Sequence, residues 1–109
     1  MSLSSWYHVS FDEEYIYRNV NPPERERWKD QFQWRDIIRI CFRPGAEFFD
    51  TDELYIFTNK REESYLIPLE ADGGSELWGE IVKRNLFDAK LAIKVASALE
   101  GLYCWPDEK

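Results

Sequence analysis

The sequence has few of the residues on which catalytic and metal sites depend. Its 109 residues include one histidine, one methionine and two cysteines. A Cys–His or Ser–His–Asp arrangement would have to be built around His8, the single histidine. The chain also has no nucleophile elbow, no glycine-rich phosphate loop and no paired zinc-ligand spacing. We therefore expect a protein that is not an enzyme and that uses no cofactor and no metal.

Long hydrophobic runs are missing as well. No stretch approaches the ~18 consecutive apolar residues of a membrane-spanning helix. The first residues lack the positive region, apolar run and cleavage site of a secretory signal. Cys41 and Cys104 lie in the short apolar runs IRICF and LYCW, which fits reduced cysteines. These features predict a cytoplasmic protein with no membrane partner.

Basic residues are outnumbered, 14 to 21, which gives a net charge of −7 and a pI near 4.7. The whole surplus lies in residues 45–80, which hold ten acids and two bases. This charge disfavours the phosphates of nucleic acids and anionic membrane surfaces as partners. It favours a protein partner with a basic surface.

Hydrophobic residues make up 44% of the chain and aromatic residues 17%, far above the content of a disordered protein. The length suits one domain, which we place at residues 6–106. Residues 1–5 are small and polar and are expected to be a disordered or artificially added N-terminus. Because aromatic residues are enriched at interfaces and an open sheet leaves an edge, a homodimer is a further expectation.

Apolar and polar residues alternate with the period of a β-strand through the first two thirds of the chain. In the clearest run, Ile38, Ile40 and Phe42 are predicted to face the core. Residues 59–64 form a polar connector suited to a hairpin. The predicted strands are residues 6–11, 15–20, 28–34, 38–43, 54–58 and 65–69.

A helical period follows residues 72–74. Ser75 is predicted to cap a first helix, and Asp88 to cap a second helix over Ala89 to Leu99. Residues 102–105 are predicted to be a last strand or a packed segment. The expected fold is α+β: a twisted antiparallel sheet of five to six strands, packed by a C-terminal pair of helices.

An acidic segment with two adjacent phenylalanines is the first candidate binding site. Aromatic side chains supply buried contact area, and acids steer a basic partner toward the surface. The calcium-loop pattern is not present, and a solvated loop is the alternative. The predicted partner-binding residues are Glu47, Phe48, Phe49, Asp50, Asp52 and Glu53.

A row of arginines is the second candidate site. Arg35, Arg39 and Arg43 share one parity, so on a single strand they would line one face and bind an anionic ligand. The alternative is that they pair with acids on neighbouring strands. Gly73-Gly74 before a helix suggests either an anion site or a plain turn, and nearby acids favour the turn. His8 is expected to be a partly exposed strand residue.

Some segments resemble known families. The strand entry Trp34-Arg35-Asp36-Ile37, a hairpin ending in Ile67-Pro68 and a C-terminal helix resemble small bacterial pleckstrin-homology-like domains. Leu77-Trp78, Leu86-Phe87-Asp88 and Tyr103-Cys104-Trp105 resemble segments of small bacterial proteins, some of them associated with toxin–immunity loci. The first resemblance implies a module that binds an anionic ligand. The second implies an immunity-like or adaptor protein that binds a basic protein partner.

Overall fold

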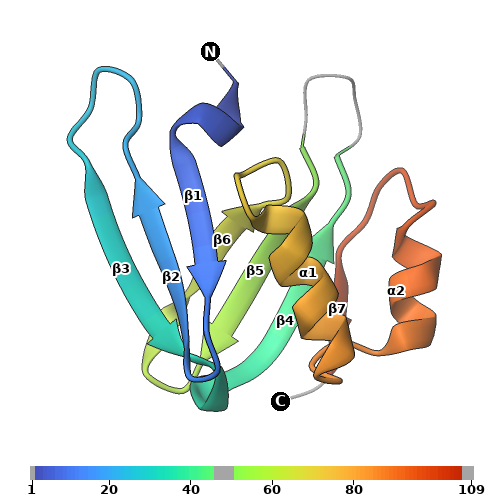
Figure 1. Cartoon of the computed structure of the whole chain (residues 1–109). Coiled ribbons are helices and arrows are strands. Elements are labelled where there is room, and N and C mark those ends of the chain that lie inside the picture. Colours follow the sequence, from blue (N-terminus) through green and yellow to red (C-terminus); the bar gives the residue numbers. More distant parts are fainter. Residues whose placement is uncertain (1, 46–50, 107–109) are drawn as a thin grey trace.

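The computed structural model describes residues 2–45 and 51–106, and it consists of two antiparallel sheets and two α-helices (Figure 1). The first sheet has the order β1-β2-β3 and the second the order β6-β5-β4-β7. The strands are β1 (Tyr7–Phe11), β2 (Tyr15–Val20), β3 (Trp28–Gln33), β4 (Ile37–Arg43), β5 (Glu53–Thr58), β6 (Arg61–Pro68) and β7 (Tyr103–Trp105). The helices are α1 (Gly74–Lys83) and α2 (Ala89–Val95), with short 3-10 helices η1 (Leu3–Ser5) and η2 (Trp34–Asp36).

The α+β class is confirmed, but the prediction of one sheet with five to six strands is wrong. Seven strands divide into two sheets because the chain turns through η2 between β3 and β4. Strand β4 therefore pairs with β5 and β7 and not with β3. The helices are also not a closing C-terminal pair, since β7 follows α2 and joins the second sheet.

The core lies between the two sheets and α1. Helix α1 packs beside β1 and lies in front of the second sheet in the view of Figure 1. Burial of apolar side chains in this core is the main favourable contribution to folding. The largest fully buried side chains are Phe87, Ile16, Ile40, Leu54, Ile56, Ile67, Leu77, Ile81 and Val20. A smaller cluster of Tyr7, Val20 and Ala71 packs with Leu3 of η1, a residue we expected to lie outside the domain.

One irregularity changes which side chains of β4 face the core. The register of β4 against β5 shifts between Ile37 and Arg39, so the strand does not alternate there. The prediction that Ile38 faces the core is therefore wrong: 46% of Ile38 is exposed, whereas Ile40 and Phe42 are buried as predicted. The connector predicted at residues 59–64 is also shorter than expected, because β6 begins at Arg61.

The two helix starts have different causes. At α2, the carboxylate of Asp88 accepts a hydrogen bond from the backbone N–H of Leu91 at 2.9 Å, which confirms Asp88 as the cap. At α1 the predicted cap, Ser75, is wrong, since the N-cap is Gly73 with a φ of 86°. This left-handed conformation suits glycine, which has no Cβ. The second helix also ends earlier than predicted, at Val95.

The two cysteines face each other across β4 and β7. Cys41 and Cys104 are direct partners in this strand pair and form a disulfide. The prediction of reduced cysteines is therefore wrong. The two cysteines are 63 residues apart in sequence, and the pairing of β4 with β7 brings their sulfurs together. Among the described helices, none has the length and apolar content needed to cross a membrane.

Candidate functional site

The acidic segment predicted to bind a partner is only partly described. Glu47, Phe48, Phe49 and Asp50 lie outside the described residues. The carboxylate of Asp52 accepts a hydrogen bond from the backbone N–H of Gly45 at 2.8 Å. The carboxylate of Glu53 binds Arg43 and accepts a hydrogen bond from the hydroxyl of Tyr55 at 2.9 Å. Both described acids therefore have bonds within the protein.

Hydrogen bonds join this segment to a second acidic stretch, the loop between β6 and α1. The backbone N–H of Leu69 donates to the carbonyl of Asp52 at 2.8 Å. The backbone N–H of Glu70 lies 3.3 Å from the hydroxyl of Thr51. Two parts of the acidic region at residues 45–80 that are distant in sequence thus lie side by side.

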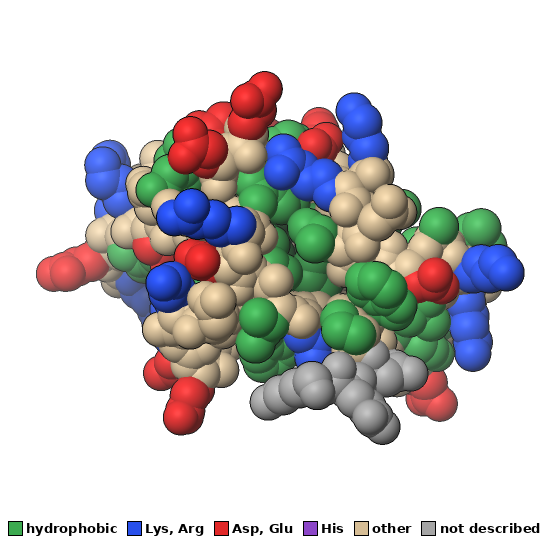
Figure 2. Space-filling model, turned by 90° about the horizontal axis from the view of Figure 1, so that it is seen from below, with side chains coloured by type: hydrophobic (Ala, Val, Ile, Leu, Met, Phe, Trp, Pro, Cys, Tyr) green, Lys and Arg blue, Asp and Glu red, His purple; other side chains and the backbone are tan. Residues whose placement is uncertain are grey.

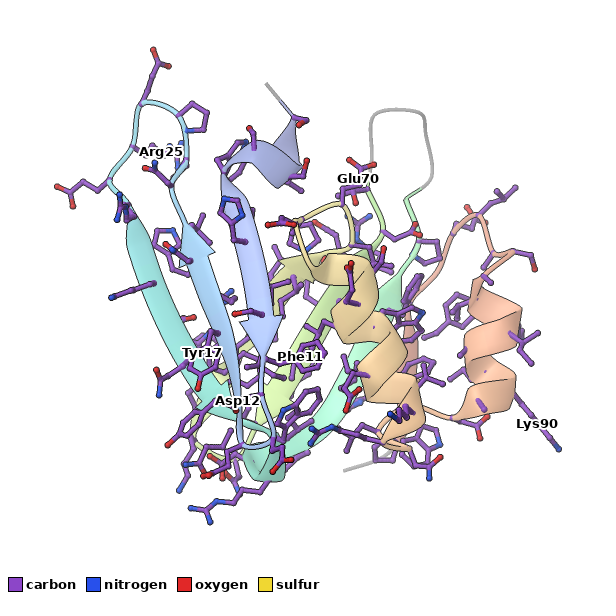
Figure 3. All side chains as sticks on the ribbon, in the orientation of Figure 1. Phe11, Asp12, Tyr17, Arg25, Glu70 and Lys90 are labelled. Atoms are coloured by element: carbon purple, nitrogen blue, oxygen red, sulfur yellow. A yellow bond between two sulfur atoms is a disulfide. The ribbon has the colours of Figure 1, made fainter. Side chains whose placement is uncertain are left out.

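Three exposed acids follow on this loop and on the first turn of α1: Glu70, Asp72 and Glu76. We call these three residues the acidic end; Glu70 is labelled in Figure 3. A carboxylate oxygen of Asp72 lies 2.8 Å from Nδ1 of His8; the His8 side chain is 45% exposed and that of Asp72 is 66% exposed. No ion pair to Glu70 or Glu76 occurs within the described part of the chain. Their carboxylates are therefore open to a partner.

The predicted arginine row does not lie on one strand. Arg35 lies on η2, whereas Arg39 and Arg43 lie on β4. Arg43 is bound by Glu53, the neighbour opposite it on β5, as the pairing alternative predicted. Hydrogen bonds to Glu53 and then to Tyr55 raise the pKa of Arg43. Anion binding by these three arginines stays a prediction. The shared face of a single strand, on which that prediction was based, is not present.

A buried arginine that the sequence analysis missed joins the two sheets. Arg18 of β2 is 7% exposed and binds Asp30 of β3 through Nε at 2.9 Å and through Nη2 at 2.6 Å. Its Nη1 donates to the carbonyl of Leu66 on β6 at 3.1 Å. Its guanidinium also lies 4.7 Å from the ring centre of Trp28 and 5.1 Å from that of Tyr65. A signal existed, because the alternation of β2 places Arg18 on the same side as the buried Ile16.

Tyr7 belongs to the same cluster. Its hydroxyl donates to the carbonyl of Leu66 and accepts a hydrogen bond from Nη1 of Arg18 at 3.3 Å. Burial raises the pKa of Tyr7, and the nearby positive charge of Arg18 opposes that rise. Burial acts to lower the pKa of Arg18, but Asp30 and Tyr7 outweigh it and the net pKa is raised. The cluster therefore keeps a charged arginine and a neutral tyrosine between the sheets, which is a structural role.

The glycine pair before α1 serves close packing. A Cβ on Gly73 would lie 2.0 Å from the carbonyl oxygen of Val9, and one on Gly74 would lie 2.6 Å from that of Leu69. Carbonyl oxygens repel anions, so this arrangement fits the plain turn and not an anion site. In the described part of the chain, no group of three or more His, Cys, Asp or Glu side chains could hold a metal ion.

Comparison with protein-family models, curated proteins and solved structures finds no match to this chain. The pleckstrin-homology-like and immunity-protein-like resemblances stay predictions.

Proposed function

We propose that the protein is a non-enzymatic interaction module that binds a basic protein partner through the acidic end. The observation that supports this function is the joining of two acidic segments by two hydrogen bonds, from the backbone N–H of Leu69 to the carbonyl of Asp52 and from the backbone N–H of Glu70 to the hydroxyl of Thr51. Exposed carboxylates that lie together raise the local negative potential and speed the approach of a basic surface. An immunity-like or adaptor protein would use such a surface.

Acids of this region have two different roles in the proposal. Asp52 and Glu53 hold the segment through Gly45 and Arg43, so they act on binding through the conformation of the chain. Glu70 and Glu76 have exposed carboxylates, so they contact the partner directly. Attraction between exposed charges is screened by salt over roughly 10 Å at 0.1 M, so the complex should weaken as salt rises.

The first test is affinity capture of partners with three forms of the protein at low and high salt. The variant E70Q/D72N/E76Q removes three negative charges from the acidic end. The control E62Q/E63Q/E100Q removes three negative charges from exposed residues elsewhere. We expect the wild type and the control to retain a basic partner at low salt and to release it at high salt. The acidic-end variant should bind the same partner with a Kd at least tenfold higher.

The comparison also has outcomes that contradict the proposal. Equal binding by the acidic-end variant would move the interface to another surface. Equal weakening by both triple variants would show that only the net charge matters. A complex that is unaffected by salt would exclude charge attraction as its main cause.

A further inference from the structure

A hollow at the opposite end of the molecule is not used by the proposed function. It has a volume of about 550 Å³ and lies between the β1–β2 turn, η2 and the end of α1. The turn is near Asp12, which Figure 3 shows far from Glu70. Volumes of 300–1,000 Å³ are typical of sites for small molecules. We call this feature the end hollow.

The walls of the end hollow are held in place by hydrogen bonds. Trp34 is 6% exposed; its backbone N–H donates to the carbonyl of Glu14 at 3.0 Å, and its indole N–H donates to the carbonyl of Asp12 at 2.9 Å. The carboxylate of Asp12 accepts bonds from the backbone N–H groups of Glu14 and Tyr15 at 2.9 and 2.8 Å. The aromatic wall and the turn that carries the acids therefore form one fixed unit.

Charges of both signs line the end hollow. Glu13 and Glu14 lie on the β1–β2 turn, whereas Arg35 and Arg84 come from η2 and from the end of α1. The guanidinium of Arg84 stacks 3.9 Å from the ring centre of Trp34, and its Nε binds Glu80 at 2.8 Å. Among the ion pairs of the described residues, none joins one of these two acids to one of these two arginines. Figure 2 views this end and shows acidic and basic side chains around hydrophobic ones.

These charges select the chemistry of the ligand. A simple anion would be attracted by the arginines and repelled by the glutamates, and the reverse holds for a simple cation. A molecule with both charges satisfies both pairs at once. The apolar part of such a molecule would contact Leu86 and the stacked Arg84 and Trp34.

We propose that the end hollow binds a zwitterionic small molecule, namely a free α-amino acid or a short peptide with both termini charged. Its ammonium group lies toward Glu13 and Glu14, and its carboxylate lies toward Arg35 and Arg84. This site does not depend on the acidic end, so either proposal can fail without the other.

Titration calorimetry tests the site with three probes that share the phenylalanine side chain and differ in which charged groups they carry. L-Phenylalanine carries both charges, its amide keeps only the ammonium group, and its N-acetyl derivative keeps only the carboxylate. The dipeptide alanyl-phenylalanine tests the peptide form. We expect saturable binding of phenylalanine or the dipeptide, and at least tenfold weaker binding of the amide and the N-acetyl derivative.

Matched variants locate the binding. The variants E13Q/E14Q and R35Q each change exposed side chains that line the end hollow, and each should raise the Kd for the zwitterion at least fivefold. E62Q/E63Q and R25Q make the same chemical changes at exposed positions outside the end hollow and should leave its Kd unchanged. Circular dichroism melting confirms that each variant folds. Absence of saturable binding to the wild type, N-acetyl-phenylalanine binding as tightly as phenylalanine, or unchanged binding in both rim variants would each overturn the proposal.

Discussion

At the scale of the residue, Arg18 is a buried charged side chain that contacts strands of both sheets. It joins β2 to β3 through Asp30 and joins the first sheet to the second through the carbonyl of Leu66. Removing one partner of a buried pair costs more than the pair contributes, because the remaining group loses its compensation. The side chain of Asp30 is 31% exposed, however, so water can replace part of the hydrogen bonding that its carboxylate loses when Arg18 is removed.

We expect R18M to lower the free energy of unfolding by about 2–3 kcal/mol and R18K by about 1–2 kcal/mol, since lysine keeps the charge but not the two-pronged bond to Asp30. Urea unfolding followed by tryptophan fluorescence measures both values. The control is R25M, because Arg25 is exposed on the loop before β3 (Figure 3). A change below about 0.5 kcal/mol in R18M, within the range of ordinary surface substitutions, would exclude the role assigned to this arginine.

Single residues also show why the sequence predicted some positions and not others. The alternation of the run that became β4 correctly placed Ile40 and Phe42 in the core. The same rule failed at Ile38, because a register shift depends on the pairing with β5 and leaves no mark in the alternation itself. The parity of Arg18 was visible, but only the folded chain shows that Asp30 and Leu66 lie within its reach.

At the scale of the element, Gly73 determines how α1 begins. Its φ of 86° is costly for any residue with a Cβ, and an added Cβ would meet the carbonyl of Val9 at 2.0 Å. That carbonyl belongs to β1, and β1 is bonded to the loop through the N–H of Val9 and the carbonyl of Asp72 at 2.8 Å. A larger residue at position 73 would therefore disturb both α1 and its contact with β1.

We expect G73A to lower the free energy of unfolding by at least ~2 kcal/mol, from the left-handed backbone and the contact with Val9 together. Gly79 lies inside the same helix, and a Cβ there would meet nothing within 4 Å. G79A should therefore raise the free energy of unfolding by about 0.5–1 kcal/mol through helix propensity. Thermal and urea unfolding of the two variants give the comparison. Equal effects in the two variants would contradict it.

Strand and helix positions were accessible to sequence reasoning because they depend on local patterns. Asp88 was identified as a cap since its side chain acts on a backbone N–H three residues away. The division into two sheets was not accessible, because it depends on which strand pairs with β4. The acidic end was partly accessible: the charge surplus of residues 45–80 is visible, but the bonds that join residues 51–52 to 69–70 are not.

At the scale of the whole molecule, the two proposed sites lie at opposite ends, and the second sheet connects them. The loop of the acidic end follows β6 of that sheet, and η2 of the end hollow precedes its strand β4. The sheet is closed at one edge by β7, a strand of three residues that pairs with β4. So short an edge strand has few hydrogen bonds of its own, and the disulfide between Cys41 and Cys104 fixes it.

The disulfide is therefore expected to stabilise the whole fold. Its cysteines are 63 residues apart, and closing a loop of that length in the unfolded chain corresponds to about 4 kcal/mol in the chain-entropy model. The double variant C41S/C104S, and the wild type in reductant, should both lose about this amount in urea unfolding.

Thiol alkylation under denaturing conditions checks the bond directly. We expect no alkylation of the wild type before reduction and two alkylated cysteines after it. Alkylation without reduction would show that the thiols are free, and an unchanged unfolding midpoint in reductant would show that the bond does not support the fold. The outcome also bears on the predicted cytoplasmic location, because stable disulfides are rare in cytosolic proteins. A disulfide that persists in protein isolated from its native source would therefore favour an oxidising compartment, where a binding partner should then be sought.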